Sequence, residues 1–335
     1  MELAVWCARH GAPELIDSQA ALLWAAECGR TAALRELRDG FGLTAENARA
    51  DNNKALYLAA CYGHVAVMRE LREGFGLGAD DARAGDNGAL RAAALYGYTE
   101  VLRELRLGYS LEANDARACD NEALCLAARD GYVEVLRELR EGFGLDADDT
   151  RASANAALRY AANNGRAEVL RELREGFGLG VNDARADNNA ALRYAAGFGH
   201  AEVLRELRRY GLGANDARAG GNWAIGLAVD YGHVEALREL RAWGLTDEDA
   251  AEGAATMTAI RDVAAPRGDV ADRPVVADPA AVRRFPAAVC PVCLEAAADT
   301  QATPCRHELC RGCFTRVLAC PICRGAITGG VSFGA

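Results

Sequence analysis

Proline is nearly absent from most of this sequence. Pro13 is the only proline before Pro266, and the other seven lie from Pro266 onward. Cysteine is just as uneven, because seven of the twelve lie between Cys290 and Cys323. The chain has 335 residues, of which 51% are hydrophobic, so we expect packed structure in two or more units. The uneven proline and cysteine indicate that these units differ in architecture.

Other absences limit the classes of function. No apolar run approaches the length of a membrane-spanning helix. Residues 1–13 contain no basic segment followed by an apolar one, so we expect no secretion signal. The formal net charge is −10, which argues against general binding to nucleic acid or to anionic membranes. We therefore expect an intracellular protein, cytoplasmic or nuclear, whose cysteines are reduced or metal-bound.

The most obvious pattern that is present is an internal repeat. The string Arg-Glu-Leu-Arg recurs at steps of 34 residues, five times, and then at one step of 33. It starts at Arg35, Arg69, Arg103, Arg137, Arg171, Arg205 and Arg238. A fixed period in this range predicts stacked supersecondary units, each contacting its neighbours.

Each unit has the pattern of two helices. In the second unit, Asn53 is placed to cap the first helix, and Leu56 and Ala59 follow at helical spacing. Gly63 then ends that helix. An asparagine occupies the cap position in six of seven units, with Gln19 in the first: Asn53, Asn87, Asn121, Asn155, Asn189 and Asn222.

The second helix of a unit is amphipathic. In the third unit Val101, Leu102 and Leu105 form its apolar stripe, and Glu100 and Arg103 are spaced to pair on the opposite face. We interpret the charges of the Arg-Glu-Leu-Arg strings as a solvated helix face.

Residues 17–250 resemble an ankyrin-repeat array. The resemblance is best at Ala191–Leu204, which has the form Ala-Leu-x-x-Ala-Ala-x-x-Gly-His-x-Glu-Val-Leu. The Thr-Pro-Leu-His of that family is replaced by Asn-x-Ala-Leu. The connection Gly-Leu-x-Ala-x-Asp-Ala-Arg-Ala favours a short helical turn over the family's β-hairpin finger. Tetratricopeptide repeats have the same period but lack the Gly-His turn, so they match less well.

Two columns of the repeat vary from unit to unit and are therefore candidates for partner contact. One column is Leu23, Tyr57, Arg91, Cys125, Arg159, Arg193 and Gly226; the other is Cys28, Tyr62, Tyr96, Asp130, Asn164, Phe198 and Tyr231. Exposed aromatic residues often anchor interfaces. The candidate substrate contacts are Tyr62, Tyr96, Phe198, Trp223 and Tyr231; the alternative is that these rings only pack between adjacent turns.

Other residues have a structural interpretation. His64, His200 and His233 share one column at the turn, so we expect no metal site there. Five cysteines have no ligand spacing and are expected to be small core residues: Cys7, Cys28, Cys61, Cys119 and Cys125.

The C-terminal cysteines have the spacing of a double zinc site. The pattern is Cys290-x2-Cys293-x11-Cys305-x-His307-x2-Cys310-x2-Cys313-x6-Cys320-x2-Cys323. Zinc in structural sites takes four Cys or His ligands in a tetrahedron, and a Cys-x-x-Cys turn supplies two of them. Eight ligands therefore predict two structural Zn²⁺ ions, each contributing on the order of 10 kcal/mol to folding.

This order of ligands resembles the RING finger. The resemblance implies interleaved sites, with Cys290, Cys293, Cys310 and Cys313 at the first zinc and Cys305, His307, Cys320 and Cys323 at the second. It also implies docking of a ubiquitin-conjugating enzyme, through the apolar Val292 and Pro321. Arg324 stands where active RING fingers keep the arginine that holds ubiquitin in its reactive pose; this catalysis is by positioning.

The segment after the last knuckle is similar to the C-terminal RING fingers of inhibitor-of-apoptosis proteins. Those dimerise, and a near-terminal aromatic residue contacts ubiquitin across the dimer. The resemblance implies a possible RING homodimer, with Phe333 in that position; the alternative is a frayed end.

The sequence thus predicts an all-α ankyrin-like repeat solenoid followed by a small zinc-stabilised RING domain. We expect the repeat array at 1–252 with a terminal cap at 1–16, a capping helix and linker at 253–286 with a helix over 247–264, and the RING finger and tail at 287–335. The predicted function is an E3 ubiquitin ligase, with the repeats binding a protein substrate. The alternative is a non-catalytic adaptor with a structural zinc module.

Overall fold

The structure is a computed structural model that describes residues 3–11, 17–264, 300–303, 307–309 and 329–332. The chain divides into two compact units, Met1–Ala265 and Pro266–Ala335. Every regular element in the described part of the first unit is a helix, as the repeat pattern predicts.

The helices of the first unit are α1 (Leu3–His10), α2 (Ser18–Glu27), α3 (Thr31–Phe41), α4 (Ala45–Cys61), α5 (Val65–Glu73), α6 (Ala79–Ala82), α7 (Ala84–Tyr96), α8 (Thr99–Leu107), α9 (Ala113–Ala116), α10 (Ala118–Asp130), α11 (Val133–Arg137), the π-helix η1 (Glu138–Gly142), α12 (Ala147–Asn163), α13 (Ala167–Glu175), α14 (Val181–Ala184), α15 (Ala186–Gly197), α16 (Ala201–Arg209), α17 (Ala214–Asp230), α18 (Val234–Ala242) and α19 (Asp247–Ala264). The strands of the second unit are β1 (Thr300–Thr303), β2 (His307–Leu309) and β3 (Gly329–Ser332).

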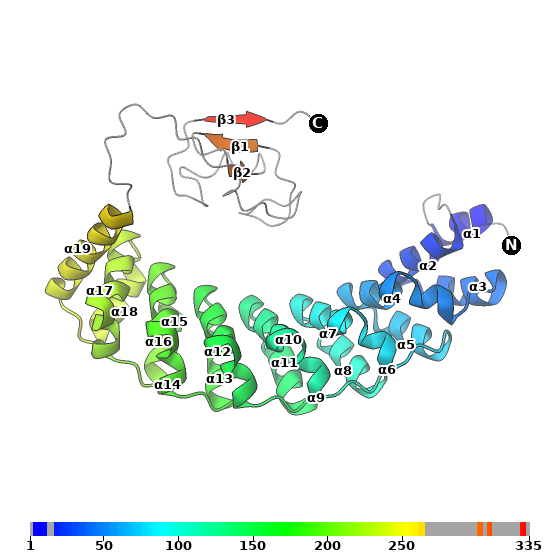
Figure 1. The fold of residues 1–335 in the computed structure, drawn as a ribbon, viewed down its shortest axis with the longest axis horizontal. Coiled ribbons are helices and arrows are strands. Elements are labelled where there is room, and N and C mark those ends of the chain that lie inside the picture. Colours follow the sequence, from blue (N-terminus) through cyan, green and yellow to red (C-terminus); the bar gives the residue numbers. More distant parts are fainter. Residues whose placement is uncertain (1–2, 12–16, 265–299, 304–306, 310–328, 333–335) are drawn as a thin grey trace. The chain divides into compact units, whose positions relative to one another are not determined.

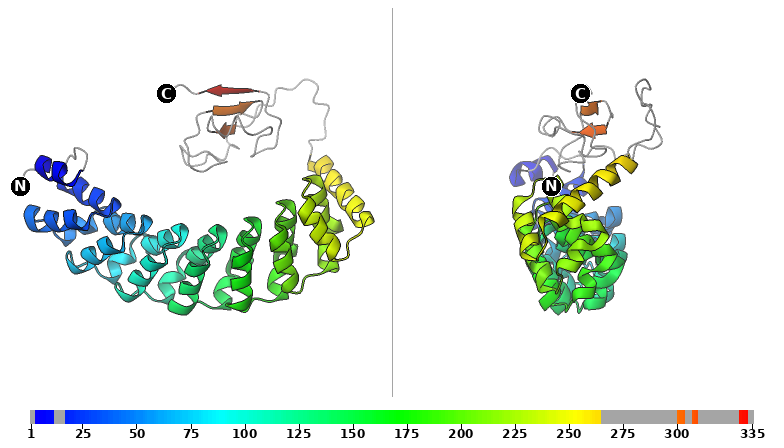
Figure 2. Two further views of the ribbon diagram at one scale, coloured as in Figure 1. Left: turned by 180° about the vertical axis from the view of Figure 1, so that it is seen from behind. Right: turned by 90° about the vertical axis from the view of Figure 1, so that its left-hand side faces the viewer.

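Seven pairs of helices make up the solenoid, and we number these pairs as repeats one to seven. The first helix of each pair belongs to α2, α4, α7, α10, α12, α15 or α17, and the second helix is α3, α5, α8, α11 continued by η1, α13, α16 or α18. Figure 1 shows the pairs side by side in a curved row. Figure 2 shows the same row from behind and from one end.

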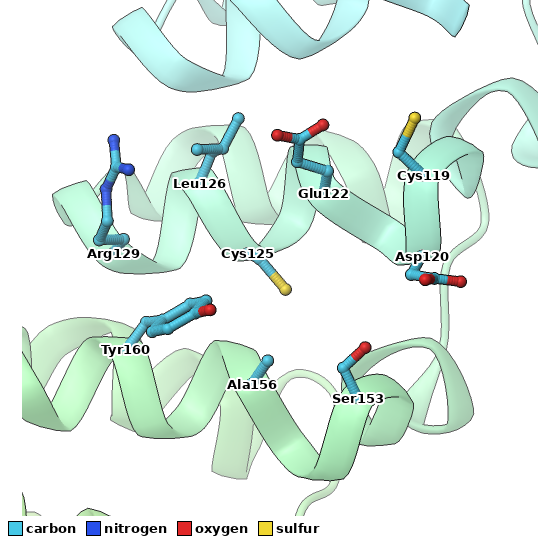
Figure 3. A pocket seen from close by; sticks show the side chains of 9 residues that line it. All are labelled: Cys119, Asp120, Glu122, Cys125, Leu126, Arg129, Ser153, Ala156 and Tyr160. Atoms are coloured by element: carbon cyan, nitrogen blue, oxygen red, sulfur yellow. The ribbon is translucent and has the colours of Figure 1, made fainter. Parts of the chain in front are cut away.

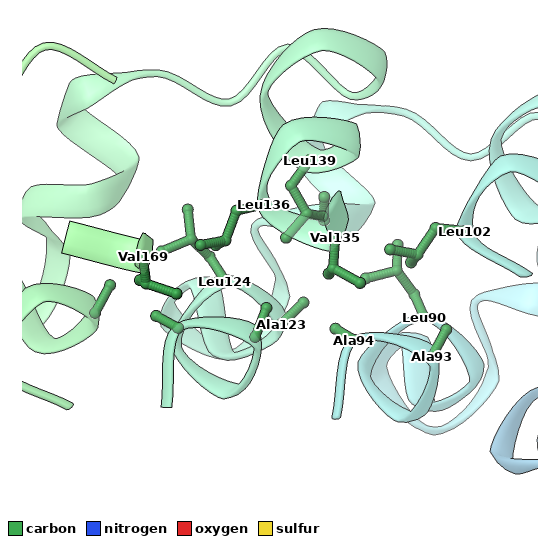
Figure 4. Close-up of a cluster of buried hydrophobic side chains, with 14 of the residues drawn as sticks. Leu90, Ala93, Ala94, Leu102, Ala123, Leu124, Val135, Leu136, Leu139 and Val169 are labelled. Carbon is green, nitrogen blue, oxygen red and sulfur yellow. The ribbon is translucent and has the colours of Figure 1, made fainter. Parts of the chain in front are cut away.

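The core runs along the whole row between the two layers of helices. Val101, Leu102 and Leu105 are fully buried, as their spacing predicts. Figure 4 shows Leu90 and Ala93 of α7 packed with Leu102 of α8, and the same arrangement in the next repeat. Burial of a leucine or valine contributes about 1.5–3 kcal/mol, and the small alanines let neighbouring helices approach closely. The interior is therefore continuous across repeat boundaries.

The asparagine column does not cap the first helices, which corrects the expectation from sequence. Asn121 follows Cys119 and Asp120, and these three residues have φ of 60°, 54° and 56°. An N-cap residue has extended backbone, whereas this is the left-handed region that Asn, Asp and Gly tolerate best. We call each such triplet a left-handed turn; they span residues 51–53, 85–87, 119–121, 153–155, 187–189 and 220–222.

A short helix precedes each left-handed turn, at the place of the hairpin finger. It forms α6, α9 and α14, and it is the opening segment of α4, α12 and α17. Its third residue, an aspartate except for Asn47 in α4, closes the first turn: the Asp81 carboxylate accepts the backbone N–H of Gly78 at 2.8 Å. The expectation of a short helical turn is confirmed, and residues 17–264 contain no strand.

The histidine column is structural, as predicted. The Nε2 atoms of His64, His200 and His233 lie 2.8, 3.0 and 2.9 Å from backbone carbonyl oxygens of the preceding repeat. Tyr98, Tyr132 and Arg166 occupy the same position in repeats three, four and five. Each side chain lies over the glycine turn of the repeat before it.

The array is closed at both ends. The helix expected over 247–264 is α19, and it packs on α17 at a close crossing. A Cβ at Gly226 would lie 2.4 Å from the carbonyl oxygen of Gly253, so only glycine permits this contact. At the other end Trp6 of α1 is fully buried and meets Trp24 edge-on, with ring centroids 5.9 Å apart.

Charged side chains bind each repeat to the next, which corrects the interpretation of a solvated face. The carboxylate of Glu104 is 7% exposed and accepts from Arg69 at 2.8 Å and from Arg72 at 3.1 Å, both one repeat earlier. The same arrangement surrounds Glu70, Glu138, Glu172 and Glu206. We call this series the Arg–Glu ladder. The predicted Glu100–Arg103 pair also forms, on the exposed side.

A second series, the Arg–Asp ladder, joins the short helices. Arg117 donates to Asp149 from Nε at 2.7 Å and from Nη2 at 3.0 Å. The matching pairs are Arg49–Asp81, Arg83–Asp115, Arg151–Asp183, Arg185–Asp216 and Arg218–Asp249. A bidentate Arg–carboxylate pair fixes the relative orientation of the two side chains as well as attracting them. The two ladders therefore hold adjacent repeats in register.

The described part of the second unit is a three-stranded antiparallel sheet in the order β2-β1-β3. Ala302 of β1 pairs with His307 of β2 and with Gly330 of β3. The pairing of β1 with β3 brings Thr300–Thr303 beside Gly329–Ser332.

Candidate functional site

The predicted aromatic contacts lie along one side of the repeats. Tyr62, Tyr96, Phe198 and Tyr231 are 49%, 49%, 55% and 42% exposed, at the end of the first helix of their repeats. Their rings also contact the side chain two residues further on, as in Phe198 and His200, whose ring centroids lie 6.2 Å apart. The two interpretations of these rings are therefore not exclusive: each is packed on one face and exposed on the other.

Trp223 differs from the other four candidates. It is half-buried, and the guanidinium carbon of Arg193 lies 4.4 Å from its ring centroid. A cation over an indole ring at this distance is attractive. Trp223 therefore joins repeats six and seven, and only part of its ring remains for a partner.

Four exposed aromatic residues of the described repeats were not among the candidates: Tyr57, Tyr98, Tyr160 and Tyr194. Tyr57 lies in a column already recognised as variable, and Tyr160 and Tyr194 are one repeat apart in the next column. For these three, the sequence signal was an aromatic residue on the polar side of the first helix of a repeat. A hydrogen bond with Cys61, together with burial, raises the pKa of Tyr57 to about 12, so its hydroxyl stays protonated.

A groove with a volume of about 550 Å³ lies between α10 and α12. Figure 3 shows the Cys125 side chain entering the space between the two helices. The lining residues are Cys119, Asp120, Glu122, Cys125, Leu126, Arg129, Ser153, Ala156 and Tyr160. The groove thus combines two carboxylates, a guanidinium, two thiols, an aromatic ring and a hydroxyl.

The cysteines of the repeats differ from the expectation that all are core residues. Cys7 is buried, but Cys28 and Cys119 are exposed and Cys61 and Cys125 are half-buried. Burial raises the pKa of the Cys125 thiol to about 11 and also raises that of Cys61. A thiol with a raised pKa is a poor nucleophile at neutral pH. No lining residue of the groove is a histidine, so the groove offers no Cys–His pair for covalent catalysis.

Most residues of the predicted zinc site lie outside the described residues. These are Cys290, Cys293, Cys305, Cys310, Cys313, Cys320 and Cys323, together with Val292, Pro321, Arg324 and Phe333. His307 is described as the first residue of β2. Within the described ranges, no group of three or more His, Cys, Asp or Glu is placed to hold a metal ion. The same ranges contain no helix that is both long and apolar enough to cross a membrane.

Comparison with known families agrees with both parts of the chain. Residues 90–183 and 158–248 match the model of ankyrin repeats in three copies. Residues 287–330 match the model of the zinc finger of C3HC4 type, the RING finger. No curated protein matches the chain.

One solved structure supports the fold of the repeats. The ankyrin repeat domain of human ASB11 aligns with a TM-score of 0.51 and 23% identity, over 65% of this chain and 96% of its own. The ankyrin repeat domain of Bcl-3, of the IkappaB family, aligns at 0.46 and 23% identity, over 66% of this chain and 97% of its own.

The fold and the family matches together define a class of protein, a helical repeat solenoid joined to a zinc finger. The chain is an ankyrin-repeat protein with a C3HC4-type RING finger.

Proposed function

We propose that this protein is a RING-type E3 ubiquitin ligase whose repeats bind the substrate. The observation that carries the proposal is the match of residues 287–330 to the C3HC4 RING finger, joined to an array of ankyrin repeats. Ankyrin repeats bind proteins and RING fingers often bind ubiquitin-conjugating enzymes. Their union in one chain supports a function that brings a protein substrate to a charged conjugating enzyme.

The donor set suits two structural zinc ions. Seven cysteines and one histidine supply eight soft ligands, which is two complete tetrahedra with no position left for water. We assign Cys290, Cys293, Cys310 and Cys313 to the first ion, and Cys305, His307, Cys320 and Cys323 to the second. The ions would supply folding free energy to a segment too short for a large core.

Three residues of the finger are assigned to the transfer step. Val292 and Pro321 supply an apolar contact for the conjugating enzyme. Arg324 donates hydrogen bonds to both the conjugating enzyme and ubiquitin, and so limits the motion of the thioester. An arginine is suited to this role because its guanidinium has five donors in a fixed plane. Catalysis here comes from orientation, which is worth several kcal/mol without any protein nucleophile.

The repeats are assigned to substrate binding. Exposed aromatic rings anchor many protein interfaces, and repeats two, three, six and seven expose such rings in one column: Tyr62, Tyr96, Phe198 and Tyr231. Trp223 offers the remaining part of its ring. The two ladders keep these residues at fixed spacing, which reduces the entropy that binding must remove.

The test is an in vitro ubiquitination assay with a panel of conjugating enzymes. We expect the wild-type protein to build ubiquitin chains, Arg324→Ala to weaken this activity at least tenfold, and Cys305→Ala to abolish it. Zinc content should be two ions per chain in the wild type. A protein that holds two zinc ions and is inert with every conjugating enzyme is instead a non-catalytic adaptor, and the ligase proposal is then wrong.

A further inference from the structure

The groove between α10 and α12 lies where one column of the repeat changes its residue type. In repeats three, five and six this column holds an arginine of the first helix: Arg91, Arg159 and Arg193. In repeat four the same position holds Cys125, whose side chain is far shorter. The opening of the groove therefore follows from the loss of a guanidinium-bearing side chain at this position.

The three arginines share one hydrogen-bond partner. In each repeat Nη2 donates to the carbonyl oxygen of the first residue of the left-handed turn. The acceptors are Gly85 at 3.0 Å, Ser153 at 2.9 Å and Asp187 at 3.1 Å. The left-handed turn thus presents a carbonyl oxygen that accepts a hydrogen bond from a guanidinium in three of the repeats.

Each of these arginines also reaches the next repeat. Arg91 pairs with Glu122, Arg159 donates to the Asp187 carboxylate at 3.0 Å, and Arg193 lies over Trp223. The chain therefore shows three examples of one binding geometry, in which a guanidinium lies between two first helices. A carboxylate or an aromatic ring of the following repeat completes its surroundings.

Repeat four has the same turn carbonyls without the arginine. The corresponding turn carbonyls belong to Cys119 and Asp120, and within residues 17–264 no side chain donates to either of them. The groove between the helices is lined by Asp120, which adds negative charge, and by Tyr160, which adds an aromatic face. Glu122 and Arg129 also line it, but each is already paired, Glu122 with Arg91 and Arg129 with Asp130. Figure 3 shows Tyr160 and Ser153 on α12 facing Cys125 across this space.

We infer that this groove binds an arginine side chain of a protein partner. The guanidinium donates hydrogen bonds to the carbonyl oxygens of Cys119 and Asp120. The Asp120 carboxylate balances its positive charge, and the guanidinium plane lies against the ring of Tyr160. Lysine does not replace it, because a single ammonium cannot reproduce the planar set of donors. The net charge of −10 further favours a basic segment. The inference deepens the proposed function, since it states how the repeats recognise a substrate.

The experiment uses the full chain and a minimal probe, N-acetyl-arginine N-methylamide, at millimolar concentration. Binding is measured by saturation transfer from the protein to the probe in NMR spectra. The lysine and citrulline analogues are the matched probes, because one keeps the charge and the other keeps the shape. We expect saturable binding of the arginine probe, at least tenfold tighter than that of either analogue. Equal binding of the lysine probe, or no binding of the arginine probe, overturns the inference.

The decisive variant places the missing side chain in the groove. Cys125→Arg should reproduce the hydrogen bonds that Arg91 and Arg159 make with the carbonyl oxygens of their left-handed turns. It should therefore weaken binding of the arginine probe at least tenfold. Cys28→Arg, at an exposed position of repeat one, adds the same charge elsewhere and should leave binding unchanged. Cys125→Leu fills the groove without a charge and should also block it, which keeps the test valid if Cys125→Arg does not fold.

Unaltered binding in both groove variants overturns the inference. The assay contains neither ubiquitin nor a conjugating enzyme. A failure to bind arginine therefore leaves the ligase proposal untouched, and an inert ligase leaves the binding result intact.

Discussion

The guanidinium of Arg106 lies one repeat before Glu138 and places Nε and Nη2 each 2.9 Å from the same carboxylate oxygen. The Glu138 side chain is 7% exposed although it belongs to a strongly polar string. A nearly buried carboxylate is stable only when charged donors replace the water it has lost. The glutamate of each Arg-Glu-Leu-Arg string is thus an inter-repeat contact, and the arginines before it are its ligands.

Removal of that carboxylate should destabilise the array. Glu138→Ala leaves two guanidinium groups without their acceptor, and because both arginines are partly exposed we expect a loss of about 1–3 kcal/mol. Glu138→Gln keeps the shape and one acceptor, so it should cost less. The measurement is urea denaturation followed by circular dichroism of the helices.

Glu134→Ala is the matched control, because the Glu134 side chain is 68% exposed and pairs only with Arg137 in its own helix. Exposed pairs of this kind contribute less than about 0.5 kcal/mol. Equal destabilisation by Glu134→Ala and Glu138→Ala would show that the Arg–Glu ladder has no structural role.

The Arg–Asp ladder predicts a sensitivity to acid. Burial alone would raise the pKa of Asp149, but hydrogen bonds from Arg117 and from the backbone N–H of Asp146 hold it below its ordinary value. The folded protein then keeps this carboxylate ionised at a pH where the unfolded chain, with an aspartate pKa of about 3.9, binds a proton. Its stabilising contribution is complete above that pKa and is lost as the pH falls through the lower, folded value.

We therefore expect the urea midpoint of the wild type to fall as the pH is lowered from about 5 toward 2. Asp149→Asn should be less stable at pH 7, by about 1–3 kcal/mol, and its midpoint should change less over the acid range. Asp148→Asn alters an exposed neighbour and should follow the wild type. A wild type and an Asp149→Asn variant with parallel pH profiles would contradict the assignment.

Two glycines with the same φ allow the cost of backbone strain to be measured apart from the cost of side-chain crowding. Gly97 and Gly144 both have φ of +78°, but a Cβ at Gly97 would lie 2.6 Å from the ring of Tyr132, whereas one at Gly144 would meet nothing within 4 Å. Both alanine variants incur the cost of a left-handed residue, about 1 kcal/mol. Gly97→Ala should lose a further ~1–3 kcal/mol because the next repeat must shift.

Thermal or urea unfolding of the two variants measures that difference. In a Tyr132→Ala background, Gly97→Ala should cost less than it does in the wild type, since the ring that causes the crowding is gone. If Gly97→Ala and Gly144→Ala have the same stability, the ring contact does not determine the requirement for glycine.

Local patterns in the sequence predicted the helix pairs, the short helical connection and the capping helix, because each depends on residues near one another in the chain. The left-handed turn was missed because Asn121 suits a helix cap as well as a left-handed backbone. The ladders were missed because Arg117 and Asp149 lie 32 residues apart, and only the stacking of repeats brings them together. The groove forms because Cys125 is smaller than the arginines at the same position in repeats three, five and six. A variable column in the sequence does not by itself show at which repeat a small residue leaves a space.

The last prediction rests on a lysine. Lys54 is the only lysine in the chain, and it is exposed at the start of the helical segment that follows a left-handed turn. Under the proposed function, self-ubiquitination is limited to this side chain, the Met1 amine and the less usual hydroxyl or thiol acceptors.

Lys54→Arg keeps the charge and should sharply reduce self-modification. Adding Arg208→Lys to that variant returns one exposed lysine and should restore it. The measurement is the ubiquitin ladder on the protein, with attachment sites mapped by mass spectrometry. Undiminished ladders on Lys54→Arg, mapped to positions other than Met1, would show that this lysine is not the main acceptor.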